Sequence, residues 1–161
     1  MDKKSLVNLV NYSEATPEVR EIFDDIMETR QSNYVNNIWR VLASHPPLLK
    51  QFWRQMKETM IKPSRLDPLT KELIYLAVSI TNNCEYCINS HTAGARTKGL
   101  DEEILGELNA IVSLANAGNR LTEGYQVPVD KIFISKAKQN NWKHIEKKTK
   151  IKKKASKPVK K

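Results

Sequence analysis

The chain has 161 residues, of which 40% are hydrophobic and 28% are charged, a composition that suits one soluble domain with a sizeable core. Only five glycines and seven prolines are present, which disfavours a turn-rich β architecture. No apolar run reaches the roughly 18 residues of a membrane span, and no secretory signal is recognised at the N-terminus. We therefore expect a cytoplasmic protein, in a reducing compartment where structural disulfides are rare.

Apolar residues recur at helical spacing through the first part of the chain. Thr16 is a suitable N-cap, and Pro17 suits the first position of the helix that follows. Pro46 is expected to end a second helix, because the residue before a proline is pushed out of the helical region. Phe52 and Trp53 in the third stretch are expected to fill the core rather than line an access path. The three predicted helices span residues 16–30, 34–46 and 46–61.

The second part of the chain continues the helical pattern. Asp67 and Asp101 are predicted N-caps, and Gly99 suits a left-handed helix C-terminus. The predicted helices span residues 67–83, 84–99, 101–118, 119–125 and 130–142. The sequence therefore predicts an all-α fold, a helical bundle.

The charge is concentrated at the C-terminus. Residues 142–161 carry ten lysines and one acid, which account for the whole formal net charge of +9. This segment has too few apolar residues to offset its ordering entropy, so we expect a helical domain at 1–141 followed by a disordered basic tail at 142–161. Lysine lacks the bidentate geometry that reads bases, so any contact of the tail with a polyanion would be non-specific and salt-sensitive. A solvated tail without a binding role is the alternative.

Both cysteines of the chain, Cys84 and Cys87, lie three residues apart, and His91 follows four residues later. A structural zinc site would need a fourth ligand, but His45 precedes two prolines and His144 lies in the tail. A structural disulfide closing so short a loop would remove little unfolded-state entropy. A redox pair is the favoured interpretation, and no metal is expected.

The surroundings of the two cysteines favour a reactive thiol. Asn82 and Asn83 resemble cap residues, which would place the cysteines in the first turn of a helix, where the dipole favours a thiolate. This argument alone points to Cys84 as the more acidic thiol. His91, however, lies one turn after Cys87 on the same face, where its imidazole can exchange a proton with that sulfur. A packed or solvated histidine is the alternative.

Glu72 lies on the preceding predicted helix, at the edge of its apolar stripe and roughly 40° from Leu76. Partial burial there would raise the pKa of Glu72 and make it a proton acceptor. A surface carboxylate is the alternative. Tyr75 on the same helix is expected to belong to the core.

The spacing of these residues resembles a known signature. Glu72, eleven intervening residues, Cys84-Glu85-Tyr86-Cys87 and then His91 resemble the E-x11-C-x2-C-x3-H pattern of the AhpD-like alkylhydroperoxidase family, the peroxidase branch of the carboxymuconolactone decarboxylase superfamily. The segments NIWRVLASHPPLLKQF, LDPLTKELIYLAVS, HTAGARTKGLDEEIL and LANAGNRL also resemble the family's segments in the same order. The resemblance covers about residues 14–127.

The resemblance implies an all-helical homo-oligomer, trimeric or hexameric, that acts as a thiol-dependent alkyl hydroperoxide reductase without a cofactor. Carried over by position, Cys87 is the peroxidatic cysteine and Cys84 the resolving one, and the two form a redox-active disulfide. Glu72 and His91 form the proton relay. A lipoyl-bearing or thioredoxin-like protein would supply the reducing dithiol.

One residue departs from the family pattern. The best-known peroxidases of the family carry a second histidine directly before the peroxidatic cysteine, where this chain has Tyr86. A tyrosine is a poor general base near neutral pH. A disulfide oxidoreductase or redox sensor with little peroxidase turnover is therefore the alternative function. Lactone decarboxylation is disfavoured, because the decarboxylase branch lacks the CxxC motif.

Overall fold

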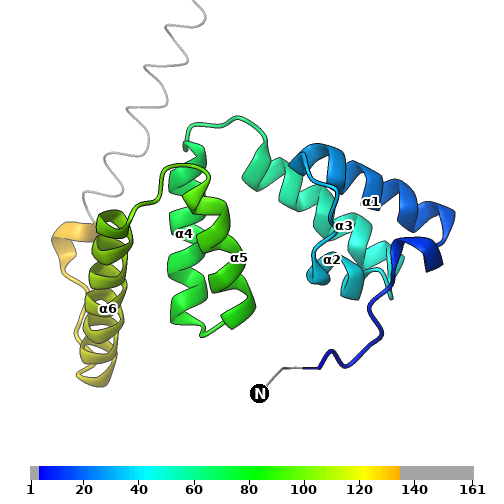
Figure 1. Ribbon diagram of the computed structural model, residues 1–161. Coiled ribbons are helices and arrows are strands. Elements are labelled where there is room, and N and C mark those ends of the chain that lie inside the picture. The colour runs from blue at the N-terminus through cyan, green and yellow to red at the C-terminus, as the bar shows by residue number, and fades with distance from the viewer. Residues whose placement is uncertain (1–3, 135–161) are drawn as a thin grey trace, which may run out of the picture. The chain divides into compact units, whose positions relative to one another are not determined.

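The computed structural model describes residues 4–134, and all its regular structure is helical (Figure 1). No strand occurs within this range, so the prediction of an all-α fold is confirmed. A short 3-10 helix, η1, precedes the first α-helix, and a π-helical turn, η2, follows the third. The elements are η1 (Tyr12–Glu14), α1 (Pro17–Arg30), α2 (Asn37–Leu42), α3 (Pro46–Met56), η2 (Lys57–Ile61), α4 (Pro68–Thr81), α5 (Glu85–Arg96) and α6 (Glu102–Gly124).

Helices α1, α2 and α3 enclose the main hydrophobic core. Trp39 is 2% exposed and lies with its ring centroid 5.1 Å from that of Trp53, in an edge-on arrangement. Phe52 packs against the same tryptophan at 5.8 Å, so the prediction that Phe52 and Trp53 belong to the core is confirmed. The Trp53 indole N–H donates to Asp25 of α1 at 2.8 Å, which ties α3 to α1.

The predicted N-caps are present. The Thr16 hydroxyl accepts from the Val19 N–H at 3.4 Å, Asp67 accepts from the Thr70 N–H at 2.9 Å, and Asp101 accepts from the Ile104 N–H at 2.8 Å. Each cap satisfies a backbone donor that has no partner within its own helix. Gly99 has a φ of 101°, in the left-handed region expected for it.

Three helices differ from the sequence prediction. The second is shorter than predicted: α2 ends at Leu42, and Pro46 begins α3 instead of ending α2, because a proline suits the first turn of a helix. The third helix does not run unbroken to residue 61, because it passes after Met56 into η2, where the Lys62 N–H donates to the Lys57 carbonyl. The predicted break at residue 118 is wrong, and α6 continues to Gly124. A glycine inside a helix costs only about 1 kcal/mol relative to alanine, too little to end a long helix whose neighbours keep their hydrogen bonds.

Helices α4 and α5 form a hairpin that carries the cysteines. They pack closely and bury Leu76 of α4 and Ala95 of α5, both 0% exposed. Asn82 is the C-cap of α4, and Asn83 adopts a left-handed φ of 54°. The prediction that these asparagines cap the cysteine helix is therefore wrong. They end α4 instead, because asparagine tolerates the left-handed conformation that a tight reversal needs.

Contacts divide the chain into two units, residues 1–109 and residues 110–161. The predicted basic tail at 142–161 and the predicted domain boundary at 141 lie outside the described residues, as does most of the predicted last helix. No helix between residues 4 and 134 has both the length and the apolar character needed to cross a membrane.

Candidate active site

The two cysteines lie at the start of α5 and are joined by a disulfide. Cys84 is the N-cap of the helix and Cys87 is its third residue, and their Cα atoms are 5.3 Å apart. Both thiols therefore belong to the first helical turn, as the sequence predicts, where the backbone N–H groups and the helix dipole favour a thiolate after reduction.

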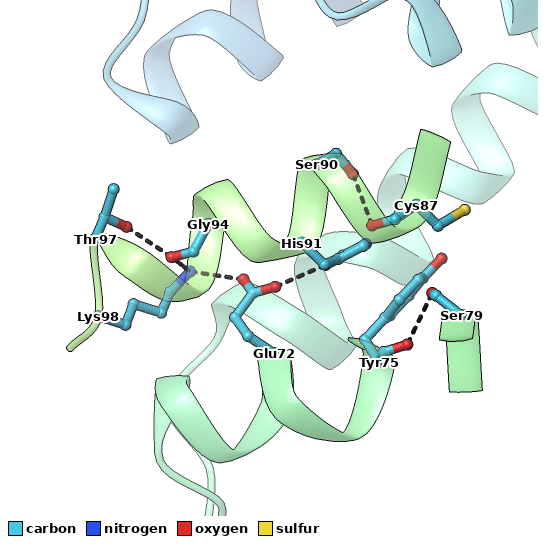
Figure 2. A network of polar contacts seen from close by, with 9 residues as sticks. All are labelled: Glu72, Tyr75, Ser79, Cys87, Ser90, His91, Gly94, Thr97 and Lys98. Carbon is cyan, nitrogen blue, oxygen red and sulfur yellow. Dashed lines mark hydrogen bonds and ion pairs between the residues drawn. The ribbon is translucent and has the colours of Figure 1, made fainter. Parts of the chain in front are cut away.

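His91 lies one turn further along α5 and is paired with Glu72 of α4. The His91 Nδ1 and Glu72 Oε2 atoms are 2.6 Å apart. Both side chains are largely buried, with exposed fractions of 15% and 11%. Figure 2 shows the imidazole between the Glu72 carboxylate and Cys87. The structure therefore brings together Glu72 and His91, which lie nineteen residues apart in the sequence.

A second side chain, that of Lys98, binds the same carboxylate. Its Nζ donates to Glu72 Oε1 at 2.6 Å and to the Gly94 carbonyl at 3.4 Å, as Figure 2 shows for the carboxylate. Lys98 was not among the site residues predicted from the sequence. A signal was present, because Lys98 falls within the helix predicted over 84–99, seven residues or about two turns after His91; α5 itself ends at Arg96.

The charge state of Glu72 differs from the sequence prediction. Burial by itself would raise the pKa of Glu72, as expected. The hydrogen bonds from His91 and Lys98 and the charge of Lys98 outweigh this effect, so the pKa of the Glu72 carboxyl is lowered. The expectation of a raised pKa is wrong, because it considered the burial of Glu72 without its hydrogen bonds to His91 and Lys98.

Two further residues, Gly94 and Tyr75, shape the surroundings of Glu72 and His91. A Cβ atom added at Gly94 would lie 3.3 Å from Glu72 Oε1, so the absence of a side chain lets the carboxylate lie against the backbone of α5. The Tyr75 ring stacks on the His91 imidazole, with centroids 3.6 Å apart and planes 21° from parallel. Tyr75 is only partly buried, so it covers one face of His91 rather than filling the core as predicted.

Tyr86, between the two cysteines, makes a long-range contact. Its hydroxyl oxygen accepts a hydrogen bond from the Ile38 backbone N–H of α2 at 3.2 Å. This contact links the cysteine turn to the N-terminal helices. The hydroxyl of the residue that departs from the family pattern therefore has a structural partner.

Other sites considered from the sequence are not assembled here. Within residues 4–134, no group of three or more histidine, cysteine or acidic side chains is arranged to hold a metal ion. The His45 side chain instead caps α3, accepting from the Leu48 N–H at 3.3 Å. A surface depression lies on the N-terminal helices beside Tyr12, Met27 and Arg40, and neither cysteine lines it.

Comparisons with known proteins gave a family match and a structural match. The family described as "Carboxymuconolactone decarboxylase family" matches residues 47–130. The crystal structure of the alkylhydroperoxidase AhpD core from Rhodospirillum rubrum ATCC 11170 is 48% identical in sequence, with a TM-score of 0.79. The match covers 82% of this chain and 98% of that one. No curated protein sequence matches the chain.

Proposed function

The chain belongs to the carboxymuconolactone decarboxylase family and is AhpD-like, and we propose that it is a thiol-dependent hydroperoxide reductase. The observation that carries this proposal is the Cys84–Cys87 disulfide placed one turn before a buried His91–Glu72 pair. A disulfide that only stabilised the fold would need neither a neighbouring base nor a buried carboxylate.

In the proposed reaction the reduced pair is the catalyst. The Cys87 thiolate attacks one oxygen of the hydroperoxide and breaks the O–O bond. The departing oxygen takes a proton and leaves as an alcohol, or as water from hydrogen peroxide, and Cys87 becomes a sulfenic acid. Cys84 then attacks the oxidised sulfur, which releases water and forms the disulfide. An external dithiol reduces this disulfide by thiol exchange and is itself oxidised.

The contacts of His91 support the proposed proton relay. The Glu72 carboxylate is hydrogen-bonded to Nδ1 of the ring at 2.6 Å. Nε2 is left to accept the Cys87 proton, directly or through one water molecule. Glu72 stabilises the imidazolium that forms, because it is ionised and almost buried. The same imidazolium can return its proton to the departing oxygen.

Of the two thiols, we assign Cys87 as the peroxidatic residue. Cys84 is nearer the helix start, where the dipole is strongest. Cys87, however, has His91 one turn away on the same face, and a base that removes the proton matters more than a partial charge. Cys84 is then the resolving thiol.

A second candidate function rests on Tyr86. The family's best-known peroxidases have a histidine here, whereas the Tyr86 hydroxyl accepts from the Ile38 N–H. With one base fewer, the pair would act mainly as a disulfide oxidoreductase or redox sensor. For either function we propose a homo-oligomer, a lipoyl-bearing or thioredoxin-like protein as the dithiol donor, and the cytoplasm as the location.

The deciding experiment is a single-turnover reaction of the reduced protein with an organic hydroperoxide. We compare wild type, Cys84→Ser and Cys87→Ser, and trap sulfenic acid with a dimedone probe. The proposal expects a trapped sulfenic acid on Cys87 in Cys84→Ser and no reaction in Cys87→Ser. If wild type consumes peroxide no faster than a free thiol but exchanges readily with a dithiol, the oxidoreductase or sensor function is correct instead.

A further inference from the structure

The Glu72 carboxylate is bound on both of its oxygens. Oε2 contacts His91 Nδ1 and Oε1 contacts Lys98 Nζ, each at 2.6 Å. The neighbouring cation on α4, Lys71, points elsewhere, because its Nζ donates to the Lys62 carbonyl at 2.8 Å. The side chains that bind Glu72 are therefore His91 of α5 and Lys98, which follows the end of α5 at Arg96.

We propose that Lys98 is a positioning residue of this site: it holds Glu72 ionised, so that the proton of His91 stays on Nδ1 and Nε2 is free to take the proton of Cys87. This inference rests on the proposed role of Cys87 as the reactive thiol. It adds to the relay a residue that touches neither the thiol nor the peroxide.

The physical reason is the burial of the carboxylate. The Glu72 side chain is 11% exposed, and a carboxyl group so poorly hydrated becomes neutral unless opposite charges compensate. A protonated Glu72 would donate to His91 Nδ1 instead of accepting from it. The ring proton would then move to Nε2, and His91 would offer a donor to Cys87 where the reaction needs an acceptor.

The fit of Lys98 supports a built position rather than a chance surface pair. The lysine side chain is 33% exposed, so much of its length lies against the protein. Oε1, the oxygen that it binds, is also the atom that a Cβ at Gly94 would approach to 3.3 Å. Gly94 therefore leaves the space that this oxygen occupies, and Lys98 provides the positive charge beside it.

The test measures the alkylation of reduced Cys87 by iodoacetamide as a function of pH, in the Cys84→Ser background. We expect Lys98→Met to move the alkylation midpoint to higher pH and to lower the rate on the acid side about tenfold, which corresponds to one pH unit. Lys98→Arg should restore the wild-type profile, because it returns the charge. Lys50→Met, which removes an exposed lysine paired with Glu18 at 3.7 Å, is the matched control and should change nothing.

An unchanged midpoint in a folded Lys98→Met protein, or a midpoint moved to lower pH, would overturn the inference, because Glu72 would then stay ionised without the lysine. If Lys98→Met does not fold, Gly94→Ala provides the second variant. It presses on Oε1 and should move the midpoint in the same direction. It is measured alongside Lys98→Gln, which keeps a donor but removes the charge; an unmoved midpoint in Lys98→Gln would overturn the inference. Alkylation needs no peroxide, so a wild type inert to peroxide would remove the proposed function and leave this result interpretable.

Discussion

At the scale of the residue, the properties of Glu72 depend on a competition between burial and charge. Burial disfavours the carboxylate, and the hydrogen bonds from His91 and from Lys98 favour it more strongly, so its pKa is lowered below the usual value near 4.5. A lowered pKa in the folded protein means that ionised Glu72 stabilises the fold. This stabilisation is fully present above the pKa of the unfolded chain and is lost as the pH falls through the lower, folded value.

The variant Glu72→Gln tests this linkage. It keeps the shape of the side chain but removes the charge, and we expect it to lower the free energy of unfolding by about 1–3 kcal/mol at neutral pH. The difference from wild type should shrink as the pH falls from about 4.5 through the lower pKa of folded Glu72, because below that value wild-type Glu72 is protonated as well. Urea denaturation at a series of pH values measures it.

Glu58→Gln is the matched control for this comparison, because Glu58 forms an exposed pair with Lys62 one turn away. Exposed pairs contribute about 0–1 kcal/mol, so its effect should be small at every pH. A Glu72→Gln effect that is the same at neutral and acid pH would contradict the ionised state of Glu72.

At the scale of the element, the hairpin of α4 and α5 holds the site, and Tyr86 ties its turn to α2. The Ile38 N–H that donates to Tyr86 is a backbone donor at the start of α2, where no partner is available within the helix. The tyrosine hydroxyl thus satisfies a helix end that lies 48 residues earlier in the chain. This contact connects the cysteine turn with the hydrophobic core of the N-terminal helices.

The variant Tyr86→Phe separates this structural role from a catalytic one. Removing one neutral hydrogen bond should lower the free energy of unfolding by about 0.5–1.5 kcal/mol and speed exchange of the Ile38 amide proton. Peroxide reactivity should change by less than about twofold, because the Tyr86 hydroxyl is bound to a backbone N–H and not to the reacting thiol. A twofold change corresponds to about 0.4 kcal/mol in the barrier. Tyr125→Phe, at a tyrosine that is 81% exposed, is the control. A loss of peroxide reactivity of a hundredfold would instead give the Tyr86 hydroxyl a part in the proton relay.

At the scale of the whole molecule, large apolar side chains remain exposed in each unit of the chain. In the first unit, Ile74 and Val78 of α4 are 51% and 54% exposed; in the second, Ile111 and Leu114 of α6 are 65% and 76% exposed. Single exposed apolar residues are ordinary, but helices with several of them are typical of surfaces that another protein covers. This pattern supports the proposed homo-oligomer.

Sedimentation equilibrium tests the assembly. We expect a mass of three or six times the 18.5 kDa of one chain, and we expect Leu114→Glu to reduce it, because burying an unpaired charge in an interface is costly. Leu6→Glu, at a leucine that is fully exposed near the N-terminus, should leave the mass unchanged. A wild-type mass of 18.5 kDa at micromolar concentration would refute the homo-oligomer.

The sequence by itself determined the local features of this protein. The caps at Thr16, Asp67 and Asp101, the all-α fold and the placement of both cysteines in one helical turn all follow from residues within four positions of each other. Such short-range patterns are readable because helix caps and helical periodicity act over a single turn. The wrong prediction of a helix break at residue 118 also came from a local pattern, because one glycine weakens a helix without deciding where it ends.

The tertiary structure decided the electrostatics of the site. The sequence could place Glu72 near a cysteine helix, but only the packing of α4 against α5 brings Lys98 to within 2.6 Å of it and reverses the expected direction of its pKa. The same packing sets Tyr75 on the face of His91, and the approach of α2 directs Tyr86 to a backbone N–H. A pKa depends on every charge within a few ångströms, and those neighbours come from separate elements whose distances no local pattern specifies.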